Sequence, residues 1–395
     1  MKQNFLILLL LLCSVLWNSC KEEGNLYYMD KGNAVPESVT NIKVEGKPGG
    51  VNISYKVPND KNLSYVKAVY EIQPGVFSEA ISSFYKDTLS LVGFGDTLEY
   101  KVNIFSVGKN NKTSKKTEIK VKPLLPPIKT VYKTLTLDAT FGGLNVTFLN
   151  EHNAELAFFV LTDTLGIGNW IPVTAYYSDV SNGKFSIRGL DAKEGKYAVY
   201  VRDRWNNKSD TLVKSLTPLF EELIHRSNFK MVAGLASDKN KGQGKNLVTN
   251  LFSGNVGTSG DLYKSEDDTY PQWFTMDMGA KVIFSRMKLF QPVQYPYVTD
   301  WVREFEILGS NELVDDISKW ISLGRFESIK PSGLPDPSYT AADMDYERAG
   351  EDYGFEEGLP AVRYMRFKVI INRGGGGKFY TLDELTFWGQ IEKKP

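Results

Sequence analysis

The chain of 395 residues contains only two histidines and two cysteines. Two cysteines exclude a disulfide framework and a four-cysteine zinc site, and two histidines argue against most histidine-based catalysis and metal binding. The net charge is zero, with 47 basic and 47 acidic residues. A nucleic-acid-binding protein needs a surplus of Lys and Arg, so we expect no nucleic-acid partner. At roughly 100–200 residues per domain, the length predicts two to four domains.

Only one long apolar run occurs, and it lies at the amino terminus. Lys2 precedes the segment Phe5–Trp17, which is almost wholly apolar. This run is shorter than the about 20 residues of a membrane-spanning helix, and a small residue, Ser19, follows it. The pattern predicts a secretory signal peptide over residues 1–20.

The end of this signal resembles that of a bacterial lipoprotein, because Leu16-Trp17-Asn18-Ser19-Cys20 stands in the place of the lipobox. Lys21-Glu22-Glu23 resembles the export signal of Bacteroidetes surface lipoproteins. The resemblance implies lipidation of Cys20 and an outer-membrane anchor at the cell surface. Several acyl chains on one residue give stable anchoring, at about 0.8 kcal/mol per buried CH2. The alternative is an ordinary secretory peptide that ends near a cysteine by chance.

A polar segment and a first β-domain follow the signal. Residues 21–36 are polar and end at a proline, which predicts a tether. Apolar and polar residues then alternate from Val51 to Val57, and Gly, Pro, Asn and Asp separate such segments. This pattern is typical of a sandwich of short strands. Residues 37–123 resemble a fibronectin type III domain, with Leu98-Glu99-Tyr100 in the place of its tyrosine corner.

A second unit repeats the pattern. Pro123-Leu-Leu-Pro126-Pro127 predicts a stiff connection. Beyond it the alternation returns, and residues 124–217 are predicted to form a second sandwich that resembles bacterial Ig-like or fibronectin-like domains. Thr217-Pro218 provides an N-cap and a first-turn proline, so we expect a short helix in a linker of residues 218–227.

The carboxy-terminal third contains five short motifs in a fixed order, within residues 271–279, 303–310, 320–323, 363–367 and 382–389. In that order and spacing they resemble a discoidin domain (coagulation factor 5/8 type C), a jelly roll also used by galactose-binding-like carbohydrate modules. The resemblance covers residues 228–392. The predicted fold class is therefore all-β, with two fibronectin III/Ig-like sandwiches followed by a discoidin-like jelly roll. The whole arrangement resembles surface lipoproteins of Bacteroidetes glycan-utilisation loci.

Two segments of this third, residues 261–270 and 291–301, combine aromatic with polar residues. The resemblance implies a ligand site in loops at one end of the jelly roll. Sugars stack on flat aromatic faces, while polar groups bind their hydroxyls. We therefore predict a polysaccharide or oligosaccharide site formed by Tyr263, Tyr295, Tyr297, Trp301, Arg303 and Tyr380. Two alternatives stay open: Tyr295 and Tyr297 pack beneath the loop, and Arg303 only pairs with Glu304 or Asp300.

The same resemblance implies a structural calcium ion between an early loop and a late glutamate. The candidate ligands here are Ser253, Asn255, Thr258 and Glu384. Calcium takes about six to eight oxygen ligands, to which backbone carbonyls also contribute. The family often has Asp where Ser253 stands, so weak binding and the absence of the ion are both open.

No nucleophile–base or metal-ligand spacing occurs, so we predict a protein without enzymatic activity. Residues 331–360 form an insertion with eight acids and one base, and paired carboxylates can serve a glycosidase. A loop rich in Pro and Gly lacks the rigid support that catalysis needs, and we expect it to be solvated. The alternative function is a subunit that contacts other surface uptake proteins. It would use this acidic insertion and the basic residues 101–122, which hold seven Lys and one Glu.

Overall fold

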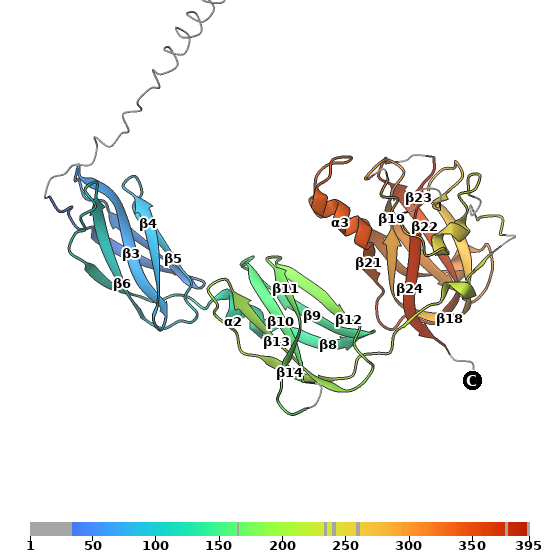
Figure 1. Cartoon of the computed structure of the whole chain (residues 1–395), viewed down its shortest axis with the longest axis horizontal. Coiled ribbons are helices and arrows are strands. Elements are labelled where there is room, and N and C mark those ends of the chain that lie inside the picture. Colours follow the sequence, from blue (N-terminus) through green and yellow to red (C-terminus); the bar gives the residue numbers. More distant parts are fainter. Residues whose placement is uncertain are drawn as a thin grey trace, which may run out of the picture.

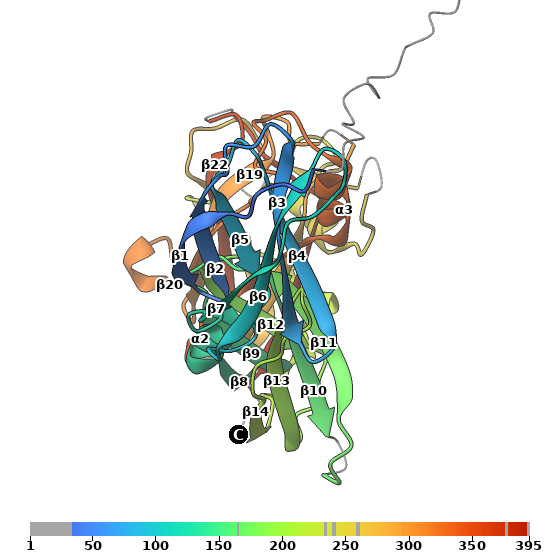
Figure 2. The same ribbon diagram turned by 90° about the vertical axis from the view of Figure 1, so that its left-hand side faces the viewer.

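The computed structural model describes residues 34–163, 166–232, 235–238, 242–257, 261–294, 296–375 and 378–392. Three β-sandwiches follow one another in an elongated row (Figure 1). Figure 2 views this row end-on, with the first sandwich in front. The predicted all-β fold class is confirmed. The predicted signal peptide and Cys20 lie outside the described residues. Within the described ranges, no helix has the length and apolar character to cross a membrane.

The first sandwich packs a three-stranded sheet on a four-stranded sheet. The three-stranded sheet consists of β1 (Thr40–Lys47), β2 (Gly50–Lys56) and β5 (Thr88–Val92). The four-stranded sheet consists of β4 (Val76–Ser83), β3 (Leu63–Gln73), β6 (Tyr100–Gly108) and β7 (Thr117–Val121), in that order. Val51, Ile53 and Tyr55 of β2 are buried between the sheets, as their alternation predicts. The hydroxyl of Tyr100 donates to a carboxylate oxygen of Asp96 at 2.8 Å, which fixes the chain before β6.

The middle sandwich has the same layout, with a short helix before it. The helix α2 (Pro127–Thr134) begins at a proline, which suits a first turn because its nitrogen needs no partner there. Ile128 and Val131 bury its inner face in the core. The three-stranded sheet consists of β8 (Thr136–Thr140), β9 (Gly143–Leu149) and β12 (Asn182–Arg188). The four-stranded sheet consists of β11 (Ile171–Ser178), β10 (Leu156–Asp163), β13 (Gly195–Asp203) and β14 (Leu212–Leu216), in that order.

The turn between β13 and β14 joins the middle sandwich to the first. Trp205 packs against Gly93 so closely that a Cβ on this glycine would lie 2.9 Å from the indole. The amide of Asn207 donates to the Gly93 carbonyl at 3.0 Å and accepts from Gln73 at 2.8 Å. Neutral groups therefore hold this joint together.

The predicted helix in the linker of residues 218–227 is wrong up to residue 225, because residues 218–225 are extended and only the single turn η2 (Arg226–Asn228) follows. The N–H of Leu219 donates to Thr140 of the middle sandwich at 2.9 Å, and that of Ile224 donates to Phe387 of the third, also at 2.9 Å. The strand β15 (Glu222–Leu223) adds to the third sandwich. Backbone carbonyls at the sheet edges of both neighbouring sandwiches accept hydrogen bonds from this segment. These bonds favour an extended chain over the helix that the local sequence predicts. Between them, Glu221 is buried and pairs with Arg286 at 3.2 Å.

The third sandwich is built around one long strand, β18 (Gln272–Phe290). Its first half pairs with β22 (Val362–Asn372) and its second half with β24 (Glu384–Ile391), with a register shift between Asp277 and Val282. Gly279 lies in this shift with a φ of 75°. The change of partner closes the two layers into the jelly roll. The other elements are η2 (Arg226–Asn228), β16 (Lys230–Met231), η3 (Val248–Phe252), β17 (Tyr263–Lys264), β19 (Val302–Ser310), η4 (Ile317–Lys319), β20 (Ile321–Glu327), α3 (Ala341–Ala349), β21 (Glu351–Gly354), β22 (Val362–Asn372), β23 (Thr381–Leu382) and β24 (Glu384–Ile391).

The acidic insertion is only partly the solvated loop that its composition predicts. Residues 331–340 are exposed, but α3 and β21 follow, and β21 pairs with β18. A capping box between Thr340 and Asp343 begins the helix. Asp343, Glu347 and Glu351 are buried. The expected solvent exposure is wrong for these three acids, because α3 and β21 direct their side chains toward the interior of the domain.

Candidate functional site

The third sandwich has one end at which its connecting loops gather. The strand register brings the start of β18, the end of β22 and the start of β19 together, and β20 ends beside them. The linker enters at the opposite end, where β15 pairs with the last residues of β24 (Figure 1). We call residues 265–271, 291–294, 296–301, 328–340, 373–375 and 378–383 the loop end. The ligand site predicted from the sequence is expected in loops of this kind.

Four of the aromatic residues predicted to bind sugar are buried at this end. Tyr263, Tyr297, Trp301 and Tyr380 are each at most 1% exposed, so the expectation that they offer open faces is wrong. Tyr263 and Tyr380 contact each other edge to face at 5.6 Å, because β17 pairs with β23 above the core. Tyr297 packs on Trp301 at 4.9 Å, as the alternative of packing beneath the loop describes. Tyr295 lies outside the described residues.

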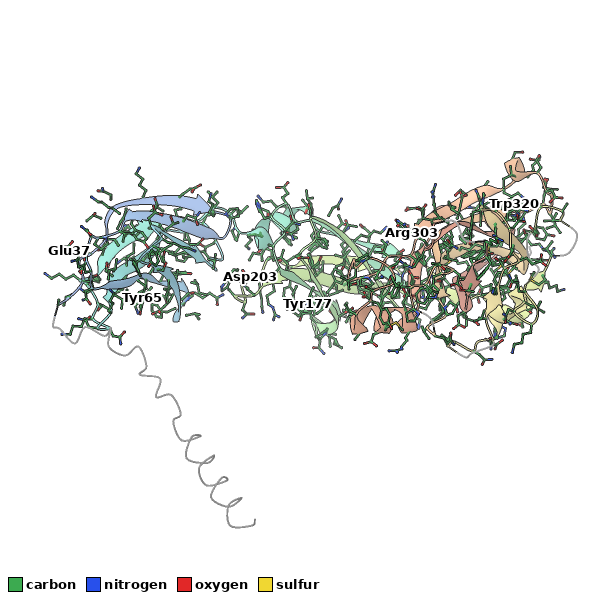
Figure 3. The ribbon with its side chains drawn as sticks, turned by 90° about the horizontal axis from the view of Figure 1, so that it is seen from above. Glu37, Tyr65, Tyr177, Asp203, Arg303 and Trp320 are labelled. Atoms are coloured by element: carbon green, nitrogen blue, oxygen red, sulfur yellow. The ribbon has the colours of Figure 1, made fainter. Side chains whose placement is uncertain are left out.

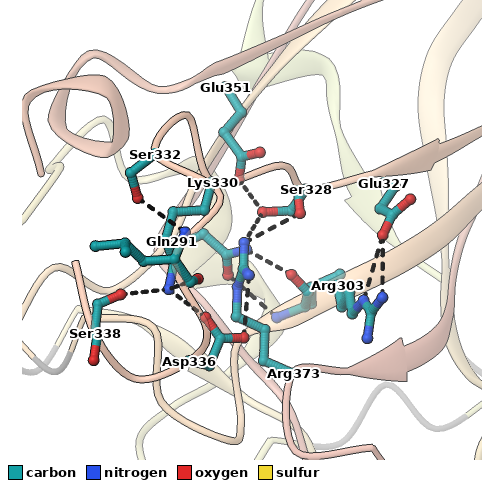
Figure 4. A network of polar contacts seen from close by, with 12 residues as sticks. Gln291, Arg303, Glu327, Ser328, Lys330, Ser332, Asp336, Ser338, Glu351 and Arg373 are labelled. Carbon is teal, nitrogen blue, oxygen red and sulfur yellow. Dashed lines mark hydrogen bonds and ion pairs between the residues drawn. The ribbon is translucent and has the colours of Figure 1, made fainter. Parts of the chain in front are cut away.

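Two buried cations flank the ring of Tyr297. The ammonium of Lys330 lies 4.3 Å from the ring centroid and the guanidinium carbon of Arg373 lies 4.9 Å from it. Asp336 pairs with both, at 2.6 Å to Lys330 and 3.3 Å to Arg373. Lys330 also donates to the carbonyls of Leu334 and Ser338, at 3.1 and 2.6 Å. These bonds tie the exposed part of the insertion to the domain (Figure 4).

Two buried glutamates, Glu347 and Glu351, lie beside this network, and Glu351 is hydrogen-bonded into it. Glu351 accepts from Ser328 at 2.9 Å and from Tyr353 at 2.7 Å. Arg373 in turn donates to the Ser328 hydroxyl at 2.8 Å (Figure 4). Burial, together with the charge of Glu351, raises the pKa of Glu347, and burial raises that of Glu351 as well. The pair is shut off from solvent, so the network stabilises the loop end but offers no accessible acid or base.

The exposed rim of the loop end carries the groups that a ligand can reach. Arg303 is exposed and pairs with Glu327 at 3.4 Å, instead of with Glu304 or Asp300. Tyr339 is 47% exposed, and its centroid lies 6.0 Å from that of Tyr297. Tyr339 is therefore the solvent-exposed member of a ring cluster whose other members, Tyr297 and Trp301, are buried. No strand periodicity marks this insertion, so the sequence alone does not single out Tyr339.

The loop predicted to hold calcium faces Glu384 with hydrogen-bond donors. The Gly254 N–H donates to the carboxylate of Glu384 at 3.0 Å, and the Ser253 hydroxyl lies 3.5 Å from the same oxygen. Arg226 lies against Gly254 and its positive charge acts on Glu384. Asn255 turns away and donates to Asp261 at 2.8 Å. Thr258 lies outside the described residues.

A calcium ion needs oxygen ligands directed at it, so the described part of this loop does not fit the ion. Burial raises the pKa of Glu384 to about 7 and that of Asp383 to about 6. Within the described residues, no cluster of three or more His, Cys, Asp or Glu side chains has the arrangement of a metal site.

Comparison with known proteins identifies the family of the chain. Three family models match successive parts: a domain of unknown function (DUF4959) at residues 36–123, another (DUF5126) at 124–227 and a third (DUF5000) at 252–389. The solved SusE-like protein BT2857 is 31% identical, and the match covers 68% of this chain and 100% of that chain, with a TM-score of 0.44. The chain belongs to the SusE-like family.

Two carbohydrate-binding modules from Clostridium perfringens are more distant from this SusE-like chain. CBM32-3 of a family 31 glycoside hydrolase is 16% identical, covers 42% of this chain and 95% of that one, and has a TM-score of 0.32. The family 32 module of NanJ, solved in complex with galactose, is 15% identical, covers 42% and 98%, and has a TM-score of 0.30. Among curated proteins, no sequence matches the chain.

Proposed function

We propose that this SusE-like chain is a non-catalytic glycan-binding protein of the cell surface, which captures polysaccharide at the loop end of its third sandwich. The observation that carries the proposal is the exposed ring of Tyr339 at that end, backed by the buried cluster of Tyr297 and Trp301. Such support holds a ring in place for stacking against the apolar face of a sugar. Arg303 and Glu327 offer a donor and an acceptor on the same rim.

A binding role agrees with the chemistry of the loop end better than an enzymatic one. A glycosidase needs two carboxyl groups that flank the scissile bond. Glu347 and Glu351 are buried below the surface, and Glu351 is held by Ser328 and Tyr353. A sugar chain on the rim therefore does not reach them.

The anchor is a separate part of the proposal. Cys20 would carry lipid at the outer membrane, and the first two sandwiches would hold the third away from it, in keeping with their arrangement in a row (Figure 1). A Cys20→Ala variant is expected to leave the membrane fraction. Retention of this variant in the membrane would contradict the anchor without touching the binding site.

The binding proposal is tested by native affinity electrophoresis of the full mature chain in gels that contain starch, yeast mannan, arabinogalactan or mucin glycans. We expect retardation by at least one of these, weakened about tenfold by Tyr339→Ala. Tyr85→Ala is the matched control, since Tyr85 is an exposed tyrosine of the first sandwich. Free migration in every gel, or equal retardation of the Tyr339 variant, would overturn the proposal.

A second candidate function is docking on other surface uptake proteins. It is favoured by apolar side chains that the edge strand β4 exposes, namely Phe77 and Ile81. Exposed apolar groups on a sheet edge are typical of a protein interface. Co-purification of membrane proteins that is lost in a Phe77→Ser and Ile81→Ser double variant, without any glycan retention, would favour this function.

A further inference from the structure

The middle sandwich carries aromatic rings on the outer face of its four-stranded sheet. Phe159 of β10 and Tyr200 of β13 lie opposite each other and stack at 5.1 Å with an interplanar angle of 11°. On the next row of this face, Ala157 lies between Tyr177 of β11 and Arg202 of β13. Because alanine is small, a hollow remains between its two large neighbours. Tyr177 is 69% exposed and forms one wall.

This hollow measures about 400 Å³, and its charged lining residues are two arginines, Arg202 and Arg204, and three acids, Glu155, Asp179 and Asp203. The carboxylate of Asp203 accepts from the N–H groups of its own turn, at 2.9 Å. The guanidinium of Arg202 lies over the ring of Phe159 at 4.4 Å, which holds it in place. In the described part of the chain, no oxygen accepts a hydrogen bond from this guanidinium. The guanidinium of Arg204 lies over the ring of Trp205 at 4.3 Å and makes an exposed ion pair with Glu155 at 3.9 Å. The hollow therefore presents guanidinium donors that have no strong partner.

A second hollow of about 440 Å³ adjoins the first and extends to the joint between the first two sandwiches. The two share Glu155, Leu156, Asp203 and Arg204 as lining residues. Figure 3 shows Asp203 at the joint and Tyr177 further along the middle sandwich. The second hollow adds Trp205 and His152. Together the two hollows, which we call the middle groove, have room for several units of a chain.

We propose that the middle groove is a glycan-binding site for an anionic polysaccharide, whose sugars carry carboxylate or sulfate groups. The exposed ring of Tyr177 suits the apolar face of a sugar. The planar fork of Arg202 suits two oxygens of one acidic group, in a bidentate contact. Two hollows in series suit a chain rather than a single sugar. The inference does not depend on the loop end, since none of these residues belongs to it.

The test uses the full mature chain in affinity gels that contain polygalacturonate, alginate, κ-carrageenan or neutral dextran. Polygalacturonate and alginate present carboxylates, and κ-carrageenan presents sulfates, so the gels separate the two sources of charge. We expect retardation by at least one anionic polymer and none by dextran, with binding that weakens as salt is added. Arg202→Gln and Tyr177→Ala should each weaken it about tenfold.

Two further variants separate this site from others. Lys193→Gln removes an exposed charge from the same sandwich, at the far end of β13, and should leave the binding unchanged. Tyr339→Ala at the loop end should also leave it unchanged, so the two glycan proposals fail independently. The proposal is overturned if no anionic polymer retards the chain, or if retardation survives both Arg202→Gln and Tyr177→Ala. Thermal melting confirms that each variant is folded.

Discussion

The loop end and the middle groove contain the same kinds of side chain but use them in opposite ways. At the loop end, the side chains of Lys330 and Arg373 are 4% and 6% exposed, and both pair with Asp336. In the groove, the guanidinium of Arg202 contacts a ring and no acceptor within the described residues. The rings follow the same division, since Trp301 is buried and Tyr177 is exposed.

This difference shows that residue type alone does not define a binding site. A cation that is enclosed with its carboxylate stabilises the fold around it, because removing either partner leaves a buried charge unpaired. A cation held in place by a ring, with its donors open, can give its hydrogen bonds to a ligand instead. Substitutions at the loop-end core should therefore lower stability, and those in the groove should lower affinity alone.

The largest expected effect is at Trp301. Trp301→Ala should lower the free energy of unfolding of the third sandwich by about 3–5 kcal/mol, because a large buried ring is lost from a packed site. Tyr177→Ala should change stability by less than about 0.5 kcal/mol, because its ring is mostly exposed. Urea unfolding of the full chain, followed by tryptophan and tyrosine fluorescence, measures both. Similar losses in the two variants would contradict the comparison.

The next effect concerns the two arginines. Arg373→Met should cost about 2–3 kcal/mol, since it removes donors from Ser328 and a charge from Asp336. The cost stays below that of a fully enclosed pair, because Asp336 is about one third exposed. Arg202→Met should leave stability within about 0.5 kcal/mol of the unchanged chain while it weakens binding of an anionic polymer. A loss of stability in Arg202→Met equal to that in Arg373→Met would remove the distinction.

The sequence predicts the fold well because alternation determines which side of a strand is buried. Val51, Ile53 and Tyr55 illustrate this, since their spacing alone assigns them to the core. The linker shows where a local signal fails. Thr217-Pro218 favours a helix, but the sheet edges at Thr140 and Phe387 are distant in sequence and lie beyond what a local pattern describes.

The candidate site was harder to predict for the same physical reason. A ring beside Pro and Asp in a loop has the same sequence signature whether it faces solvent or the core. Tyr297 is buried because Lys330 and Arg373 come over it from distant parts of the chain. Arg202 and Tyr177 form a hollow only because the strand register places Ala157 between them. Long-range pairing of this kind does not show in a single sequence.

A smaller effect is expected on pH dependence. Burial raises the pKa of Glu347 and Glu351, so the native state retains protons that the unfolded chain releases. The resulting stability is fully present below the ordinary glutamate pKa and is lost as the pH rises through the raised values. The melting temperature of the third sandwich should therefore fall between about pH 5 and pH 8, by the equivalent of about 1–2 kcal/mol.

Two variants attribute this slope to the buried pair. Glu347→Gln should flatten it, because the amide needs no proton to remain neutral. Glu356→Gln is the control, since Glu356 is an exposed acid of the same insertion. A slope that remains in Glu347→Gln would show that the buried pair does not cause it.

The smallest expected effect is that of a chelator on the melting temperature. It tests whether the partly enclosed carboxylate of Glu384, like Asp336 at the loop end, is paired by the protein's own groups. Glu384 accepts from the Gly254 N–H and lies near the positive charge of Arg226. The protein thus supplies by itself the positive charge that an ion would bring. EDTA should change the melting temperature by less than about 1 °C, within the range of a neutral surface substitution. Arg226→Gln should lower it further than EDTA does. A fall with EDTA that added calcium reverses would show instead that the loop rearranges around an ion, and that this end of the domain depends on a charge from outside the chain.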